Sequence, residues 1–400
     1  MKNLLFFLKR YGNKSFDELP FNENDALLLS QISYLYFEKV VKDNSRGYNL
    51  KKVMTDDNAL DLCYGAMNFK NNMRLVKLFK NTTRYDNIIF SDLVSNFDVI
   101  NKQQFFAMTF WIADILFLSF RGTDLSMVGW REDFNMWFSE ETPCQIDAVK
   151  YTEMIYNKYN RKMILAGHSK GGNLAFYAAL YSSPKAIDKV IKVLSFDGPG
   201  LKDKEPFQSE EYKRIEDRCV TYSSASSIVA ILLYHVDDVI FLKSRSFSIL
   251  QHSAYNWYIK DANSLARRKN NKLLSRFLDR ALTRYLAIST DKERQRFVDV
   301  LFKVAEDNPE ASLLDIKHHP FRYLKNVLRR KKLLTYSQNE LLKLEFKKLR
   351  VCFKDVYDQR RIAKKKRKAK KMLLSKTNKW AILCRSFLML IAIHFLICYI

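Results

Sequence analysis

The segment Gly167-His168-Ser169-Lys170-Gly171 decides the fold, because it places a serine between two glycines at a tight turn. The apolar run 163–166 precedes it and predicts a buried strand, and the segment 172–180 follows it and predicts a helix with a face of small residues. Strand, tight turn and helix in this order are the context of a nucleophile elbow, where a Cβ on either glycine would collide with the adjoining strand and helix. The sequence therefore predicts an α/β fold with Ser169 as a nucleophile.

A second strand-like segment, 114–120, leads into Arg121-Gly122-Thr123-Asp124. Acyl transfer to a serine requires two hydrogen-bond donors for the oxyanion, one from the residue after the nucleophile and one from a separate loop. We expect the backbone N–H of Lys170 to be the first donor and that of Thr123 to be the second. The helix after Ser169 would add the positive end of its dipole.

These motifs resemble those of known lipases. Phe120-Arg121-Gly122-Thr123, then Trp130 and Asp133, and the segment 167–175 are similar to the FRG[ST], W..D and GHSxGG.LA motifs of class 3 lipases. The chain more closely resembles a bacterial lipase-like α/β-hydrolase family of uncharacterised function. Its members carry a GHSKGGNLA elbow, an FDGPG segment (196–200 here) and a late Gln-His (251–252 here). The resemblance covers about residues 15–260 and implies an α/β-hydrolase fold.

A serine nucleophile needs a histidine base, and α/β-hydrolases carry the triad in the order serine, acid, histidine. His168 lies inside the elbow and cannot turn back onto Ser169. The later candidates are His235, His252 and the pair His318-His319. We favour His252, because it ends the apolar segment 247–252, which predicts the last core strand, and because it matches the family's Gln-His.

The acid is predicted at Asp197, which follows the expected strand 190–196 and enters Gly198-Pro199-Gly200. That position lies at the carboxyl edge of the sheet, where doubly wound proteins place their chemistry. Class 3 lipases take their acid from a later Asp-x-Val-Pro segment, but the equivalent stretch here, 225–230, has no carboxylate. The predicted triad is therefore Ser169, Asp197 and His252, with Asp237 or Asp238 as the alternative acid.

The alternation of strands and helices predicts a mostly parallel sheet covered by helices on both faces. Residues 1–100 are expected to be the mainly helical N-terminal part of the hydrolase domain, 101–260 its core, 261–379 a basic helical extension and 380–400 a membrane anchor. Strands are expected near 104–111, 114–120, 163–166, 190–196, 218–223, 238–243 and 247–252, and helices near 126–138, 147–159, 172–180 and 226–235.

The segment 380–400 is almost wholly apolar, and a basic block, 360–371, precedes it. A bilayer span needs about 20 residues. Arg385 interrupts the apolar segment near its start, where a long side chain can snorkel to the headgroups. Because basic flanks stay on the cytoplasmic side, we predict a tail-anchored protein of the cytoplasmic membrane with its hydrolase domain in the cytoplasm. A helix lying flat in the interface is the alternative.

The net charge of +25 points to an anionic partner. Electrostatics alone suit lipid headgroups and nucleic acid equally. The sequence has no zinc-finger spacing, RNP sequence or KH-type loop, so no specific nucleic acid is expected, and the apolar tail favours a membrane. Its six cysteines form no C-x-x-C pair, which indicates reduced thiols, and neither a metal nor another cofactor is expected.

Two classes of function remain. The first is a membrane-associated serine hydrolase, similar to lipases and esterases, that cleaves a carboxylic ester or acyl lipid. The second is a catalytically silent lipase-like module that serves as a membrane-attached interaction protein. The presence of Ser169, Asp197 and His252 together favours the hydrolase, because a silent site would tolerate the loss of any of them.

Overall fold

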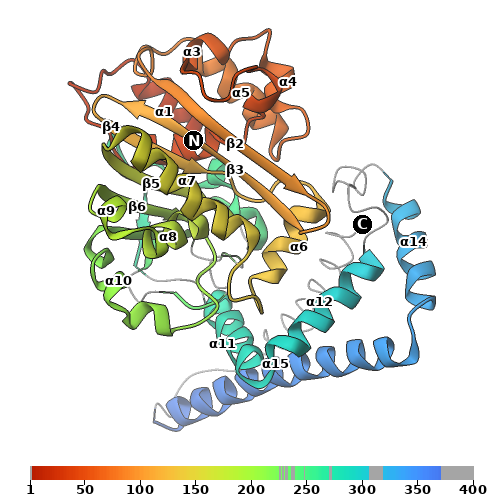
Figure 1. Cartoon of the computed structure of the whole chain (residues 1–400). Coiled ribbons are helices and arrows are strands. Elements are labelled where there is room, and N and C mark those ends of the chain that lie inside the picture. Colours follow the sequence, from red (N-terminus) through yellow and green to blue (C-terminus); the bar gives the residue numbers. More distant parts are fainter. Residues whose placement is uncertain are drawn as a thin grey trace. The chain divides into compact units, whose positions relative to one another are not determined.

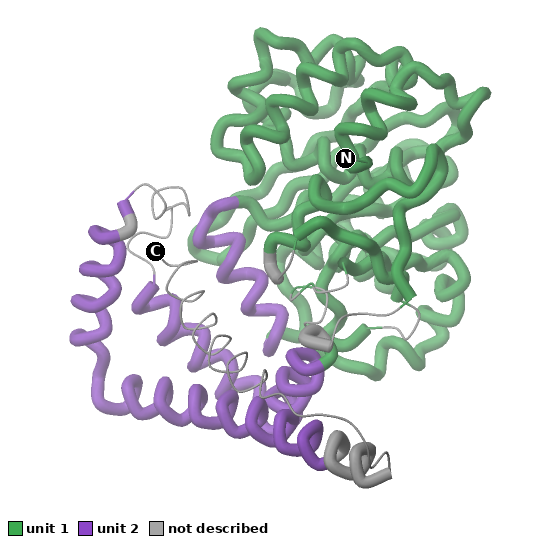
Figure 2. The backbone as a smooth tube through the Cα atoms, turned by 180° about the vertical axis from the view of Figure 1, so that it is seen from behind, with its two compact units in different colours: residues 1–124, 139–276 green, residues 125–138, 277–400 purple. Residues whose placement is uncertain are grey.

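The structure, a computed structural model, describes residues 2–224, 227, 229, 233–235, 239–246, 248–269, 273–305 and 319–370. The chain divides into two compact units (Figure 2). Residues 1–124 and 139–276 form the first unit, and residues 125–138 and 277–400 form the second. The division is not sequential, because a short segment after the Thr123 loop leaves the first unit and belongs to the second.

The described residues of the first unit form a nine-stranded sheet whose strands lie side by side in chain order (Figure 1). These strands are β1 (Tyr48–Asn49), β2 (Ile89–Asp98), β3 (Gln103–Ile112), β4 (Ile115–Phe120), β5 (Lys162–His168), β6 (Val190–Phe196), β7 (Cys219–Ser224), β8 (Val239–Leu242) and β9 (Arg267–Arg268). Strands β4 to β8 run parallel, whereas β1 to β4 and β8 to β9 pair antiparallel. The sheet is therefore mixed, and the expectation of a mostly parallel sheet is corrected.

Strand β2 lies in the part expected to be mainly helical. Its register shifts between Ser91 and Val94, and Asp92 has a positive φ of 55°. Such a bulge breaks the alternation of apolar and polar residues by which a strand is recognised in a sequence. The short connection from β2 to β3 then makes the pair antiparallel, as is usual for a hairpin.

Helices cover both faces of the sheet (Figure 1). On one face, α7 (Pro143–Tyr159) packs on β3, and α8 (Lys170–Tyr181) packs on β4, β5 and β6. On the other, α2 (Glu23–Ile32) packs on β4 and β5. Because side chains alternate along a strand, Phe117 and Ile164 join the cluster of the N-terminal helices while Leu116 and Leu165 face the opposite layer. The remaining helices of this unit are α1 (Leu4–Tyr11), α3 (Leu50–Val53), α4 (Ala59–Cys63), α5 (Phe69–Phe79), α9 (Pro184–Ile187) and α10 (Glu210–Lys213).

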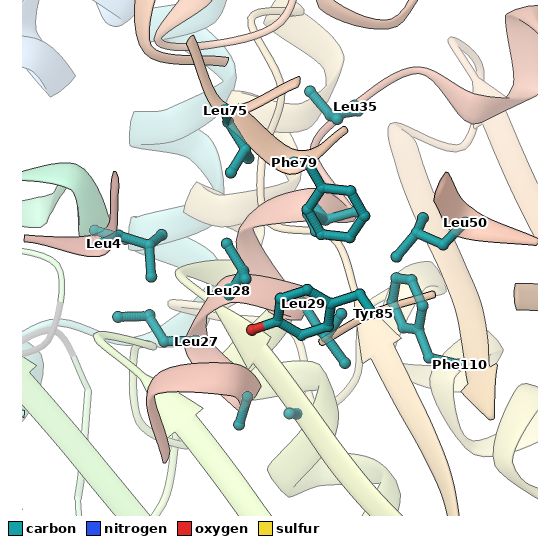
Figure 3. Packing of buried hydrophobic residues seen from close by; sticks show 14 of the residues in the cluster. Leu4, Leu27, Leu28, Leu29, Leu35, Leu50, Leu75, Phe79, Tyr85 and Phe110 are labelled. Carbon is teal, nitrogen blue, oxygen red and sulfur yellow. The ribbon is translucent and has the colours of Figure 1, made fainter. Parts of the chain in front are cut away.

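The N-terminal layer packs as one apolar cluster with a fully buried ion pair beside it. Leucines of α1, α2 and α5 surround Phe79 and Tyr85 (Figure 3). Arg84 donates to Asp25 at 2.6 and 2.8 Å, and both side chains are fully buried. Nη1 of Arg84 also donates to the carbonyl of Leu19 at 2.7 Å. These contacts satisfy the buried charges and join the start of α2 to the segment before β2.

The described residues of the second unit are mainly helical. Its helices are α6 (Met127–Asn135), α11 (Leu273–Ile288, which starts just before the unit boundary), α12 (Asp291–Ala305), α14 (Pro320–Lys332) and α15 (Tyr336–Lys370). The apolar side of α6 packs against α12 and α14, and the ring centroids of Phe134 and Phe302 are 5.6 Å apart. Arg131 of α6 also forms an ion pair with Asp299 of α12.

In the part of the chain that the structure describes, no helix is both long and apolar enough to cross a bilayer. The predicted anchor at 380–400 lies outside that part, and the basic block before it forms the end of α15 up to Lys370.

Candidate active site

Ser169 is the one residue between the end of β5 and the start of α8, and its backbone conformation is strained. Its φ is 59° and its ψ is −133°, values that a residue with a side chain rarely adopts. Its N–H donates to the carbonyl of Phe196 on β6 at 2.9 Å, and its own carbonyl accepts from Gly172 N at 2.8 Å. A Cβ on Gly171 would lie 2.0 Å from the Phe120 carbonyl oxygen, so the elbow requires glycine there.

Asp197 lies beside Ser169 because β5 and β6 are parallel neighbours. His168 pairs with Phe196 in their register, so the next residue of each strand leaves the sheet at the same edge. Asp197 is fully buried and has a φ of 57°. Its Oδ1 accepts from the backbone N–H of Ser224, at the end of β7, at 2.8 Å.

His252 is hydrogen-bonded to this carboxylate, with Nδ1 2.7 Å from Asp197 Oδ2. The imidazole remains partly accessible, with 14% of its side chain exposed, whereas the carboxylate has no exposed area. Among the described residues, no hydrogen bond joins His252 to Ser169 Oγ. Contacts of this kind are often long in a free enzyme and shorten when substrate binds.

The segment that carries His252 is not the strand that the sequence predicts. Residues Ser248–His252 form a short 3-10 helix, and the edge of the sheet beyond β8 is taken by β9. The physical reason is distance across the sheet: β8 lies two strands away from β6, and Asp197 directly follows β6. The chain must leave the sheet after β8 to bring His252 back to Asp197, and tertiary contacts override the local apolar pattern.

The loop with Thr123 is held next to the elbow. Phe120 pairs with Gly167 in the β4–β5 register, and a Cβ on Gly122 would lie 2.6 Å from the His168 carbonyl oxygen. Arg121 anchors this loop: its guanidinium donates to the Ser33 carbonyl at 2.6 Å and to both carboxylate oxygens of Glu38. The arginine of the FRG motif therefore holds this loop in place from a buried position.

The two residues expected to supply the oxyanion donors belong to segments that meet at the elbow. Lys170 is the first residue of α8, so its backbone amide lies at the N-terminus of that helix. Thr123 is 5% exposed and follows the glycine that touches the elbow. The geometry brings together all five predicted site residues: Ser169, Asp197, His252, Thr123 and Lys170.

The other sequence candidates have different outcomes. Asp237, Asp238 and His318 lie outside the described residues. His319 precedes α14 in the second unit. His235 follows Tyr234, which forms an antiparallel bridge with Leu201, so it does not end a helix as expected.

Three residues near the elbow escaped the sequence analysis. Tyr34 contacts His168, Gln104 contacts the Lys170 ammonium group, and Ser224 donates to Asp197. Tyr34 and Gln104 precede the elbow by many residues and carry no motif of their own. Only Ser224 had a local signal, because it directly follows the predicted strand 218–223, which comes next in the chain after the strand that leads into Asp197.

Comparison with known proteins places the chain in a family. Residues 79–303, more than half of the chain, match the Mbeg1-like family. The chain belongs to the Mbeg1-like family. This confirms the predicted relationship to a lipase-like α/β-hydrolase family. Among solved structures, the Lip2 lipase from Yarrowia lipolytica is 12% identical over 59% of this chain and 93% of that chain, with a TM-score of 0.32. No curated protein matches significantly.

His168 gives a prediction for the pH dependence of stability. Burial, followed by the charge of His252, lowers the pKa of His168 from 6.5 to about 3. Between these two values the unfolded chain binds a proton that the folded chain does not, so the free energy of unfolding decreases as the pH falls through this window. From pH 7.5 to pH 4.5 we expect the wild type to lose about 2 to 3 kcal/mol more than His168→Gln in urea unfolding. An equal loss in both proteins would contradict the lowered pKa.

Proposed function

We propose that the protein is a serine hydrolase that cleaves a carboxylic ester or acyl lipid through Ser169, Asp197 and His252. The observation that carries this proposal is the 2.7 Å hydrogen bond from the His252 imidazole to the buried Asp197, beside a serine held at a φ of 59°. A buried carboxylate that orients a partly accessible histidine next to such a serine is the arrangement of an activated nucleophile. Membership of the Mbeg1-like family supports the same class of chemistry.

In the first step, Ser169 Oγ attacks the carbonyl carbon of the ester, and His252 Nε2 takes the hydroxyl proton. Asp197 accepts the hydrogen bond from Nδ1–H, which fixes the tautomer with Nε2 as the base and stabilises the imidazolium. The carbonyl oxygen becomes an oxyanion that accepts from the amides of Lys170 and Thr123. The tetrahedral intermediate then breaks its bond to the alcohol oxygen, and His252 gives that oxygen the proton.

The second step reverses these roles with water. His252 takes a proton from a water molecule, whose oxygen attacks the acyl carbon on Ser169, and the same two amides again hold the oxyanion. The bond between the acyl carbon and Ser169 Oγ breaks, His252 returns a proton to Ser169, and a carboxylic acid leaves. These two reaction steps require neither a metal nor a cofactor.

We further propose that the protein works at the cytoplasmic face of a membrane, with residues 380–400 as a C-terminal tail anchor. The basic end of α15 supports this, because it would lie beside anionic headgroups if the following segment enters the bilayer. The substrate would then be an acyl ester or lipid present at that surface.

Replacing the nucleophile tests the proposed function directly. Ser169→Ala should abolish labelling by a fluorophosphonate probe and lower kcat on p-nitrophenyl butyrate by on the order of 10⁶, because the lost atom forms the acyl-enzyme bond. The fold should persist, since Ser169 is not part of the core. Ser182→Ala, at the other end of α8, is the matched control and should label like the wild type. Equal labelling of Ser169→Ala, or none of the wild type, would favour the catalytically silent alternative.

Replacing the base and replacing the acid should lower kcat by different amounts. His252→Ala should cost nearly as much kcat as Ser169→Ala, because the imidazole moves the proton. Asp197→Asn should cost somewhat less, about 10⁴, since the carboxylate mainly fixes the tautomer. The exposed Asp188→Asn is the control and should have no effect. Should Asp238→Asn abolish turnover while Asp197→Asn does not, the acid assignment is wrong.

The anchor can be tested by truncation. Deleting 380–400 should leave a protein that salt removes from membranes, because the remaining basic block contributes about 1 kcal/mol per residue near an anionic surface and is screened by salt. The full-length chain should stay bound until detergent is added. Turnover of p-nitrophenyl butyrate should survive, since the site lies in the first unit. Release of the full-length chain by salt alone would instead favour a helix lying in the interface.

A further inference from the structure

The residues on either side of the nucleophile are both buried and polar, and both reach away from Ser169. His168 is 5% exposed and Lys170 is 1% exposed. We infer that both are positioning residues: His168 holds the backbone that carries His252, and Lys170, through Gln104, holds the loop that carries Thr123. This inference rests on the proposed hydrolase function and assigns to the elbow a second task beyond presenting the serine.

His168 contacts the backbone of the proposed base. Its Nε2 lies 2.7 Å from the carbonyl oxygen of His252, and the centroids of the two rings are 4.7 Å apart. A carbonyl oxygen can only accept, so Nε2 must carry the proton. His252 is then held at two points, its ring by Asp197 and its backbone by His168.

Tyr34 holds the other side of His168. Its hydroxyl donates to the His168 carbonyl oxygen at 3.1 Å and lies 3.0 Å from Nδ1. In a neutral imidazole with the proton on Nε2, Nδ1 is an acceptor, so the single hydroxyl proton is shared between Nδ1 and the carbonyl oxygen. Because burial lowers the pKa of His168 to about 3, the ring stays neutral and Nε2 remains its donor at neutral pH. The base is thus tied to the N-terminal layer through the elbow.

Lys170 reaches β3 on the opposite side of the elbow. Its Nζ donates to the backbone carbonyl of Gln104 at 2.7 Å and to the side-chain Oε1 of Gln104 at 2.9 Å. The same Oε1 accepts from the backbone N–H of Asp124 at 3.3 Å. The side-chain amide of Gln104 therefore links the residue after the nucleophile to the residue after Thr123.

This link controls the separation of the two oxyanion donors. One donor is the backbone amide of Lys170 itself, and the other, that of Thr123, is one residue from the amide held by Gln104. An ammonium group buried to this extent requires such acceptors, so the contact is maintained once the protein folds. Since a shift of about 1 Å at a reacting centre can cost about a hundredfold in rate, a loosened loop should slow catalysis without altering the core.

The positioning role of His168 is tested with variants that keep or remove the Nε2 donor. His168→Gln places an amide N–H at a similar reach and should retain most of kcat. His168→Phe keeps a ring without the donor and should lose about ten- to a hundredfold in kcat on p-nitrophenyl butyrate, with KM unchanged. Tyr34→Phe should lose less, and the double variant Tyr34→Phe/His168→Phe should be no worse than His168→Phe alone, because the two act in series. The half-buried Tyr48→Phe, on β1, is the matched control.

The positioning role of Lys170 is tested in the same way. Lys170→Met and Gln104→Met should each lower kcat by about tenfold or more with KM unchanged, and the double variant should show non-additive loss. Gln104→Glu keeps the acceptor for both the ammonium group and the Asp124 amide, so it should retain activity. Lys51→Met removes a partly buried lysine far from the elbow and should behave like the wild type.

Each variant is also labelled with fluorophosphonate and its Tm is measured, which separates positioning from folding. The inference is overturned if the Phe and Met variants match the wild type, if their losses merely follow Tm, or if His168→Gln and Gln104→Glu are as slow as the others. In these cases the wild type still labels and Ser169→Ala does not, so the hydrolase proposal stands. If the wild type itself does not label, the hydrolase proposal fails and the inference falls with it.

Discussion

No side chain fits between the first turn of α8 and the end of β4. A Cβ on Gly171 would be 2.0 Å from the Phe120 carbonyl oxygen, and one on Gly167 would be 2.3 Å from the carbonyl oxygen of Gly171. This close approach fixes where α8 begins and forces Ser169 into its strained conformation between the two glycines. It also brings the Arg121 loop against the backbone of the elbow. The proposed nucleophile and both proposed oxyanion donors depend on this single contact.

The order of the strands explains why the N-terminal segment reaches the site. Strands β4 to β8 are parallel and follow one another in chain order, and right-handed crossovers that all progress in one direction lie on one face of a sheet. The opposite face must be covered by chain from elsewhere, and α2 covers it. The residues just after α2 then lie beside the elbow, so Ser33 accepts from Arg121 and Tyr34 contacts His168. Without this layer the parallel strands would expose an apolar face to water.

The sequence predicted the parts of the site that depend on neighbours along the chain. The elbow, strand 190–196 and Asp197 have local signatures, because glycine spacing and an apolar run suffice to place them. The 3-10 helix at His252 could not be predicted, since it depends on contacts with Asp197 and His168 that are remote in the chain. Strand β2 was not predicted either, because its bulge disrupts the alternation of apolar and polar residues by which a strand is recognised. Gln104 illustrates the limit: nothing in the sequence around it indicates a contact with a lysine that follows four intervening elements.

The pairing of α6 with distant helices has a consequence for synthesis. The apolar side chains Met127, Trp130 and Phe134 are covered by Val298 and its neighbours. A ribosome adds about 5–20 residues per second, so a nascent chain would wait on the order of 10 s or more between making α6 and making its cover. By the end of that interval strands β5 to β9 have also been made, while the apolar side of α6 is still without its cover. A fragment ending at residue 276 would keep this exposed surface permanently, and it would be prone to aggregate however well its sheet had formed.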